Sequence, residues 1–371
     1  MTFHVKHTPL SPLAFLEHAI SELKSRDEYR RRSPAPPDPA RSFWSNDYLA
    51  LASQPALGGA CGAGASRLVS GDSVEHEDVE REAAALVQQP AALAFSSGYC
   101  ANVGLLGALL DRHSFVVLDA LSHASIIDGV RLSRAHLSVA PHGDASAVAE
   151  RLARADGRRA IVITESYFSM DADSPDLVKL RSVCDRYGAA LVVDEAHALG
   201  VLGPEGRGLC VERGVRADAI VGTFGKAFGA SGAFVAGSEV LIDWLWNRAR
   251  SFVFSTGMSP AVARAAASGL RTAREQPQRR ARVRAAADEL RSGLAKAGVV
   301  AAGYGHIIPW IVGGNAEALR MADALSGAGV DVRAIRPPSV AEGTARLRLT
   351  VTAAHTAEDI SRLVDVVAGL V

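Results

Sequence analysis

Six short apolar runs, separated by segments whose apolar residues recur with helical spacing, occupy the middle of this 371-residue chain. The runs are residues 91–95, 115–118, 160–163, 190–193, 219–221 and 233–236. Runs this short and this apolar are typical of strands that are buried on both faces of a sheet. Their alternation with helices predicts an α/β fold, with a mostly parallel sheet wrapped by helices.

Polar residues follow five of these runs, at the point where each predicted strand ends. They are Ser96-Ser-Gly-Tyr99, Asp119-Ala-Leu-Ser-His123, Thr164-Glu165, Asp194-Glu-Ala-His197 and Thr223-Phe-Gly-Lys226. Open α/β sheets bind their ligands at the carboxyl ends of the parallel strands. We therefore expect these five segments to build one site.

The acid Asp194 and the lysine Lys226 follow two different strands, 32 residues apart. This pair suits a pyridine aldehyde cofactor: the amine forms a Schiff base and later serves as a general base, while the carboxylate keeps the ring nitrogen protonated. A plain surface lysine is the alternative, because most lysines are exposed. A strand end beside an acid is an unusual place for one, so the sequence predicts a pyridoxal phosphate enzyme.

Two other nucleotide-related readings compete with this one. Asp194-Glu-Ala-His197 matches the D-E-A-H box of a helicase, which also needs a phosphate loop ending in Gly-Lys-Ser/Thr. Here the Gly225-Lys226 step is followed by Ala227, and the glycine spacing is wrong. The glycine-rich segment 62–67 follows no clear strand, so it is weak as a dinucleotide motif and is more typical of a loop.

Three further features have a functional and a structural interpretation. Ser97-Gly98-Tyr99 opens a predicted helix and could hold a phosphate, or it could be an ordinary strand–helix turn. His123 could stack on a cofactor or be a core histidine. Arg346 and Arg348 share one face of a predicted strand, where they could bind a carboxylate or form a solvated ladder.

Charge and cysteine usage narrow the partners. Lys plus Arg and Asp plus Glu each count 40, so the net charge gives no reason to expect nucleic acid or a membrane surface. The four cysteines contain no C-x-x-C pair, which favours reduced thiols in the cytosol over a disulfide framework or a metal site. With no signal peptide and no spanning segment evident, we expect a cytoplasmic protein with a small-molecule substrate.

The chain divides into three predicted parts: an N-terminal helix and arm (1–45), a large cofactor-binding domain (46–260) and a small α+β domain (261–371). A helix is expected over 11–32, ended by the proline-rich stretch 33–39. The Ala- and Arg-rich stretch 261–297 predicts helix with its arginines on a solvated face; a basic nucleic-acid helix is the sharper alternative. The tail predicts strands at 303–312 and 345–351 and helices at 316–327 and 357–371.

With these residues placed, the chain from about Ser42 onward resembles the α-oxoamine synthases. These are fold-type-I pyridoxal phosphate enzymes that condense an amino acid with an acyl thioester and release carbon dioxide. The matching segments are Ser45-Asn-Asp-Tyr-Leu49, Gly64-Ala-Ser-Arg-Leu-Val-Ser-Gly71 with His76, Ser97-Gly-Tyr99, Leu121-Ser-His-Ala-Ser125, Thr164-Glu-Ser-Tyr-Phe-Ser-Met-Asp171, Asp194-Glu-Ala-His197, Thr223-Phe-Gly-Lys226 and Phe254-Ser-Thr256.

The resemblance implies a role for each cofactor-site residue. Lys226 forms the Schiff base, Asp194 pairs with the pyridine nitrogen, and His123 stacks on the ring. His197 polarises the thioester carbonyl, and both His197 and Ser169 contact the ring oxygen. The phosphate and the rest of the cofactor are held by Gly98, Tyr99 and Thr223 and, across the interface of a homodimer, by Ser255 and Thr256.

The resemblance also implies a substrate side. Arg348 takes the amino-acid carboxylate, Ser339 and His123 lie beside the substrate, and Arg30 contacts the acyl chain. The segments 334–340, 343–350 and 353–355 favour L-alanine and a pimeloyl thioester, carried on coenzyme A or on a carrier protein. Departures from the family pattern are a shortened segment before Ser45, Ala198-Leu199 after the site histidine, Ser339 and Ala341.

Two alternatives stay open from the sequence. One is a sibling synthase that uses glycine or serine and a different acyl thioester. The other is a binding or scaffold protein that keeps the fold without the chemistry.

Overall fold

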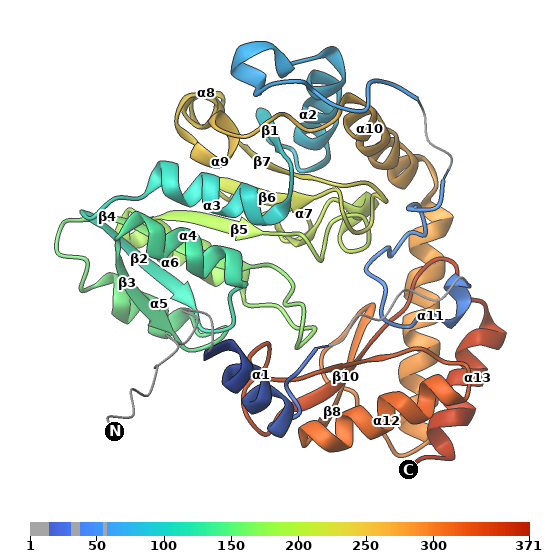
Figure 1. The fold of residues 1–371 in the computed structure, drawn as a ribbon. Helices are drawn as coiled ribbons and strands as arrows, with labels where there is room; N and C mark the ends of the chain where they lie inside the picture. Colours follow the sequence, from blue (N-terminus) through green and yellow to red (C-terminus); the bar gives the residue numbers. More distant parts are fainter. Residues whose placement is uncertain (1–14, 31–37, 55–57) are drawn as a thin grey trace, which may run out of the picture.

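Two sheets form the frame of the molecule in a computed structural model that describes residues 15–30, 38–54 and 58–371 (Figure 1). The larger sheet has seven strands in the order β1-β7-β6-β5-β4-β2-β3. Its strands are β1 (Ala91–Phe95), β2 (Ser114–Asp119), β3 (His136–Ala140), β4 (Arg159–Glu165), β5 (Ala190–Asp194), β6 (Ala219–Thr223) and β7 (Ala233–Gly237). All six predicted strands are confirmed, and β3, at the edge of the sheet, is an addition.

Strand direction brings the predicted site segments to one edge. The neighbours from β3 through β2, β4 and β5 to β6 pair in parallel, and β7 is antiparallel to both β6 and β1. The other six strands therefore point the same way. Their carboxyl ends, which include Phe95, Asp119, Glu165, Asp194 and Thr223, lie along one edge, as predicted from the sequence.

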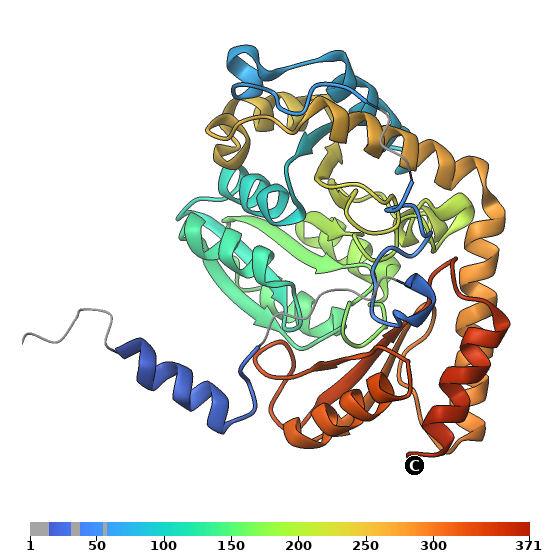
Figure 2. The ribbon, with the colours of Figure 1, turned by 45° about the vertical axis from the view of Figure 1, so that its right-hand side comes forward.

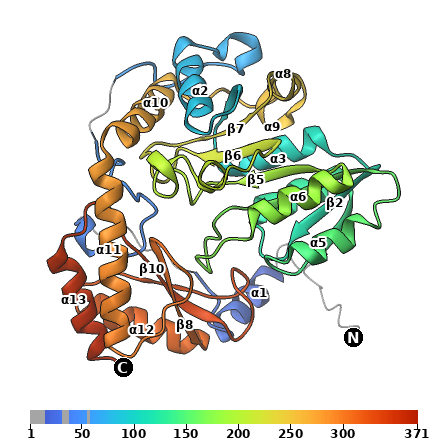
Figure 3. The same cartoon turned by 180° about the vertical axis from the view of Figure 1, so that it is seen from behind.

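Helices cover both faces of the large sheet, and alternate strand residues divide between two cores. In β2, Val116 and Leu118 pack with α3 (Gly98–Leu109) and α4 (Ala124–Ser133), while Phe115 and Val117 join the core that contains α5 (Ala145–Leu152) and α6 (Leu177–Tyr187). Figure 1 has α3 and α4 toward the viewer, and Figure 3, from behind, has α5 and α6 in front. Because helices cover both faces of the sheet, residues on both sides of an inner strand such as β2 are buried, and most of them are apolar.

The remaining helices of this half flank the sheet. They are α2 (Val74–Leu86), α7 (Leu209–Glu212), α8 (Glu239–Arg248) and α9 (Arg250–Val253). No helix in the described ranges is both long enough and apolar enough to span a membrane.

The Arg-rich stretch forms two helices, α10 (Pro260–Glu275) and α11 (Pro277–Lys296), which break at Gln276 before Pro277. The prediction that its arginines line a solvated face is wrong. Arg280 is buried, Arg271 pairs with carboxylates of α2, and Arg279 and Arg291 donate to main-chain carbonyls. Arg271 and Arg279 thereby join this stretch to α2 and to Leu49, whereas the partners of Arg280 and Arg291 lie within residues 261–371.

The tail forms the predicted small α+β unit. Strands β8 (Ile307–Gly313), β9 (Arg333–Ile335) and β10 (Ala345–Thr350) make an antiparallel sheet in the order β8-β10-β9, covered by α12 (Asn315–Gly327), while α13 (Ala357–Ala368) packs on α11. Strand β9 was not predicted. One continuous apolar core includes residues of both sheets, so the division at residues 45 and 260 stays a prediction.

The predicted helix 11–32 is shorter than expected. Helix α1 spans Phe15–Ser25 and ends where Asp27 takes a left-handed φ of 54°; residues 11–14 and 31–32 lie outside the described ranges. None of its residues is buried, and Figure 2 shows it standing away from the body of the protein.

A buried glycine in β6 offers a test of this packing. A Cβ at Gly222 would lie 2.4 Å from the Phe234 ring and 2.6 Å from Leu199 Cδ1, so Gly222→Ala should reduce the free energy of unfolding by about 1–3 kcal/mol. Gly107 on α3 has no atom within 4 Å of its Cβ position, and Gly107→Ala should be neutral or stabilising by up to about 1 kcal/mol. Thermal unfolding of the two variants measures the difference; equal midpoints would contradict it.

Candidate active site

Lys226 lies three residues beyond β6, in the turn that leads toward β7, and is half-buried. Its amine forms no hydrogen bond or ion pair with any residue that the structure describes. Burial lowers the pKa of the Lys226 ammonium to about 8, although the nearby Asp194 and Glu165 carboxyl groups act in the opposite direction. The amine is therefore much closer to its neutral, nucleophilic form than an ordinary lysine.

Asp194 is the last residue of β5 and is buried. Its Oδ2 accepts a hydrogen bond from Asn102 Nδ2 at 2.9 Å, and its Oδ1 accepts one from the Ala196 backbone at 2.9 Å. Asn102 comes from α3 and also donates to Ser125 Oγ at 3.0 Å. The carboxylate is thus fixed in direction and interacts electrostatically with Lys226 without forming an ion pair with it.

His123 follows β2 and caps the start of α4. Its backbone amide donates to Glu165 Oε1 at 2.8 Å, and its Nδ1 accepts from the Ser125 backbone at 3.2 Å. Partial desolvation of the ring lowers the pKa of His123, and Lys226 lowers it further, against the opposing effect of Asp194. Because Nδ1 is the acceptor, the neutral ring carries its proton on Nε2.

Glu165, at the end of β4, stands beside this histidine and is buried. Burial raises the pKa of the Glu165 carboxyl to about 8, and neighbouring Asp194 adds to the rise. At neutral pH this carboxyl is therefore largely protonated, and it adds no second negative charge next to Asp194.

His197 is buried and lies three residues beyond the end of β5. Its Nδ1 is 2.8 Å from the hydroxyl of Tyr48, which is also buried. Burial holds the pKa of His197 well below its usual range, and the charges of Lys226 and Arg348 contribute. The ring is consequently neutral at physiological pH and its orientation is set by the tyrosine.

Arg346 and Arg348 on β10 are both buried, which rules out a solvated ladder. Arg346 forms an ion pair with Asp171 at 2.7 Å. Arg348 instead binds neutral groups: Nε donates to the Ser169 carbonyl at 2.6 Å, Nη1 to Asn46 Oδ1 at 3.1 Å, and Nη2 is 3.4 Å from the Tyr48 hydroxyl. Within the described ranges no carboxylate pairs with Arg348, so its charge remains available for an anion.

The start of α3 provides backbone donors. Ser97 caps the helix by accepting from the Cys100 amide at 3.1 Å, and no atom lies within 4 Å of the Cβ position of Gly98. The positive end of the α3 dipole, with open space beside Gly98, favours an anion. Tyr99 is exposed and its hydroxyl bonds Asp128, while Thr223 Oγ1 donates to the Gly232 carbonyl at 3.0 Å.

The predicted site residues do not all come together. His123, Asp194, His197, Lys226 and Arg348 form one electrostatic cluster, and Ser169 contacts it through Arg348. Arg30 and Ser339 form a separate pair, with Arg30 Nη2 donating to Ser339 Oγ at 3.2 Å. Ser255 and Thr256 lie in the loop after α9 and make no described contact with the cluster.

Several residues of this site were not predicted. Tyr48 and Asn46 lie in a segment used only for the resemblance, and Asn102 and Glu165 were assigned no role. The signal for Asn102 was available, since it is an amide on the otherwise apolar segment 101–106 of a helix that follows a strand. A buried amide must find a partner, and here the partner is the site carboxylate.

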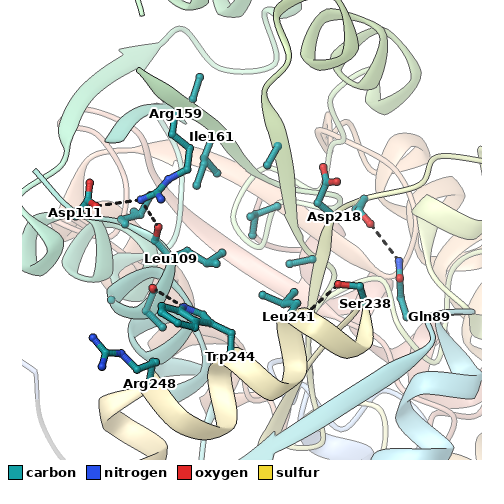
Figure 4. A pocket seen from close by; sticks show the side chains of 18 of the residues that line it. Gln89, Leu109, Asp111, Arg159, Ile161, Asp218, Ser238, Leu241, Trp244 and Arg248 are labelled. Carbon is teal, nitrogen blue, oxygen red and sulfur yellow. Dashed lines mark hydrogen bonds and ion pairs between the residues drawn. The ribbon is translucent and has the colours of Figure 1, made fainter. Parts of the chain in front are cut away.

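A separate cavity of about 1370 Å³ lies at the opposite, amino-terminal edge of the strands (Figure 4). It is lined by the starts of β4, β5 and β6 and by parts of α3 and α8. Arg159 pairs with Asp111 there, and Trp244 donates to the Ala108 carbonyl of α3. None of the predicted site residues lines this cavity.

Comparison with known proteins agrees with this geometry. Residues 43–367 match the aminotransferase class I and II family, and the chain belongs to that family. It is 44% identical to 8-amino-7-oxononanoate synthase of Methylococcus capsulatus, an alignment that covers 95% of this chain and 97% of the relative. The alignment is long enough to include both sheets.

Solved structures share the fold. One described as a high-resolution structure of SPT with the PLP internal aldimine has a TM-score of 0.89 and 26% identity, covering 97% of this chain and 98% of that one. A crystal structure of 8-amino-7-oxononanoate synthase from Francisella tularensis has a TM-score of 0.74 and 26% identity, covering 88% and 96%. The chain therefore has the fold-type-I architecture of these enzymes.

The lowered pKa of Lys226 predicts unusual reactivity. Reductive methylation at Lys226 should rise with pH through a midpoint near 8, well before that of an ordinary lysine at about 10.4. Asp194→Asn removes a charge that favours the ammonium, so the midpoint should move to lower pH. Peptide mass spectrometry across a pH series, with the exposed Lys179 as internal reference, measures both; an unchanged or higher midpoint in the variant would contradict the assignment.

Proposed function

We propose that the chain condenses L-alanine with a pimeloyl thioester to give 8-amino-7-oxononanoate, carbon dioxide and the free thiol, a step of biotin biosynthesis. The observation that carries this proposal is the 44% identity to 8-amino-7-oxononanoate synthase over nearly the whole of both chains. The lysine, aspartate and arginine that such chemistry needs lie in one cluster.

The cofactor is pyridoxal 5′-phosphate, which supplies the ring that accepts the electrons released at the substrate α-carbon. The residues present fit it. Lys226 has an amine without a hydrogen-bond partner among the described residues, Asp194 has a fixed carboxylate, and open space lies over Gly98 at the start of α3. Asp194 would face the pyridine nitrogen and the α3 amides would hold the phosphate.

The chain's own residues then divide the work. Lys226, neutral to a large extent near pH 8, takes the α-proton of the amino acid. His123 would lie against the cofactor ring, and His197, held by Tyr48, would present a neutral N–H toward the thioester carbonyl. The two histidines are already oriented by hydrogen bonds, His123 with Ser125 and His197 with Tyr48, which reduces the reorganisation that the reaction requires.

The substrate ends are assigned by charge. Arg348, whose three contacts are all to neutral oxygens, binds the amino-acid carboxylate. Arg30 and Ser339 are exposed and joined by a hydrogen bond, and we place the far end of the acyl chain near them. Whether the thioester is carried on coenzyme A or on a carrier protein does not alter these roles.

A sibling condensation with glycine or serine is the second candidate. The SPT structure, which superposes with a TM-score of 0.89, favours keeping it, because that fold and this one agree over 97% of the chain. The two reactions use the same carbanion chemistry and differ in the amino acid and the acyl group.

A substrate panel separates the candidates. Thiol release should be fastest with L-alanine and a pimeloyl thioester, compared with glycine or serine and with acetyl, succinyl or palmitoyl thioesters. Lys226→Ala should lower turnover by more than about a thousandfold and remove the visible absorbance of the bound cofactor. Preference for glycine or serine would replace this proposal by the sibling function, and a colourless, inactive wild-type protein would reject both.

We also propose a cytoplasmic homodimer whose sites are completed at the interface, with Ser255 and Thr256 reaching the phosphate in the other subunit. Support comes from exposed apolar side chains on segments that neighbour Ser255 and Thr256. Phe254 is 73% exposed, and Val69 and Val74 are similarly open to solvent. A group of exposed apolar side chains, unlike a single one, is typical of a protein–protein interface.

Sedimentation tests the assembly. The holoenzyme should sediment as a dimer, and Phe254→Asp should shift it toward monomer with a parallel loss of cofactor affinity, because a charge would enter an apolar interface. Val300→Asp, at an 89% exposed position elsewhere, is the matched control and should change neither property. A monomer with full cofactor affinity would reject the interface.

A further inference from the structure

Three ionisable side chains form a cluster beside the cofactor site. His142, two residues beyond the end of β3, lies between two carboxylates: its Nδ1 is 2.9 Å from Asp119 Oδ1 and its Nε2 is 2.9 Å from Asp173 Oδ2. Asp119 ends β2, and Asp173 lies in the segment after β4. The ring also meets Phe168 edge to face at 4.4 Å. None of these residues has a role in the proposed reaction.

The geometry determines the charge of the histidine. A neutral imidazole has a single N–H and could donate to only one of the carboxylates, whereas an imidazolium donates to both. The two hydrogen bonds, that to Asp119 first, raise the pKa of His142 to about 10, against partial burial of the ring. The Asp119 and Asp173 carboxylates are the charged groups that face it.

Asp119 connects this imidazolium to the segment that carries His123. Its Oδ1 accepts from the Leu121 amide and its Oδ2 from the Gly143 amide, both at 2.9 Å. The turn from β2 to α4 is therefore folded around the Asp119 carboxylate. His123 follows Leu121 by two residues.

Asp173 connects the imidazolium to the segment 166–173. This segment contacts Arg348, the arginine proposed to bind the substrate. Within the described ranges, His142 makes the only hydrogen bond to the Asp173 side chain. The segment is closed by two backbone bonds of 2.9 Å, from Phe168 to the Asp173 carbonyl and from Ala172 to the Phe168 carbonyl. Its Ser169 carbonyl accepts from Arg348 at 2.6 Å.

We propose that His142, as an imidazolium, is a positioning residue for the amino-acid carboxylate site. It fastens the segment 166–173 to the segment that carries His123, and so fixes Arg348 of the small sheet relative to the large sheet. Without its charge, the carboxylates of Asp119 and Asp173 would face each other unneutralised, and their repulsion would displace the Ser169 carbonyl. The inference rests on the proposed role of Arg348 in the reaction described above.

The first test is spectroscopic and needs no turnover. Nitrogen NMR of the histidine side chains in the holoenzyme, with the His142 signals assigned by their loss in His142→Asn, should show both ring nitrogens protonated at neutral pH. A neutral ring that titrates near the ordinary value of about 6.5 would overturn the proposal.

The second test is kinetic. In His142→Asn, KM for L-alanine should rise by about tenfold while kcat and the cofactor affinity change by less than about threefold, because the carboxylate site is loosened and Lys226 and Asp194 keep their places. His113→Asn, at an exposed histidine, is the matched control and should change none of these. Equal changes in the KM for L-alanine and the KM for the pimeloyl thioester, or no change in either, would overturn the proposal.

Asp173→Asn supplies an independent readout if the first variant folds poorly. It keeps an oxygen acceptor and removes one charge, so the pKa of His142 should fall toward neutrality and KM for alanine should rise with pH. A KM for alanine that stays independent of pH would count against the positioning role of His142. If the wild-type enzyme does not turn over alanine, the proposed function fails, while the NMR result and alanine binding, followed by cofactor absorbance, still decide the role of His142.

Discussion

Parallel hydrogen bonding between β4, β5 and β6 is the constraint on which the candidate site depends. The register pairs Glu165 with Asp194 and Asp194 with Val221, so the two acids are adjacent and the chain that leads to Lys226 starts beside them. Side chains at the carboxyl ends of such strands lie along one edge of the sheet. The segments that follow the strands, and not the strands themselves, must form the walls of a site there. A slip of one residue would turn Asp194 to the other face and separate it from Lys226.

Desolvation then acts on every ionisable group at this edge, and it acts in opposite directions on acids and bases. It lowers the pKa of Lys226 to about 8 and raises that of Glu165 to about 8. The same burial therefore produces a partly neutral amine and a largely neutral carboxyl. The neighbouring Asp194 carboxylate is held in direction by hydrogen bonds from Asn102 and from the Ala196 backbone.

The sequence predicted the strands that are mostly buried, including the edge strands β1 and β8, and missed the two edge strands that are largely exposed or half-buried, β3 and β9. Strand β3 escaped because His136 and Leu137 are exposed and its apolar run is interrupted, as expected for an edge strand that has one neighbour. The prediction that the arginines of α10 and α11 line a solvated face was wrong because their spacing resembles that of an exposed helix face. What some of them contact, such as the Leu49 carbonyl bound by Arg279 and the Asp78 carboxylate bound by Arg271, is set by segments distant in sequence. Local pattern carries no information about such partners.

The site shows the same division between local and distant information. Asp194, His197 and Lys226 were predictable because they lie at the ends of two predicted strands, β5 and β6, and the topology brings those strand ends together. The hydrogen-bond partners of Arg348 were not predictable, because Asn46, Tyr48 and Ser169 come from segments far from β10 in the sequence. Arg346 and Arg348 are alike in sequence, yet one is neutralised by Asp171 and the other has only neutral partners. A buried guanidinium without a counter-ion is costly in a stable fold, and a carboxylate ligand would supply the missing charge. The difference between two neighbouring arginines thus supports the proposal that Arg348 binds the substrate carboxylate, by an energetic argument that sequence spacing alone does not provide.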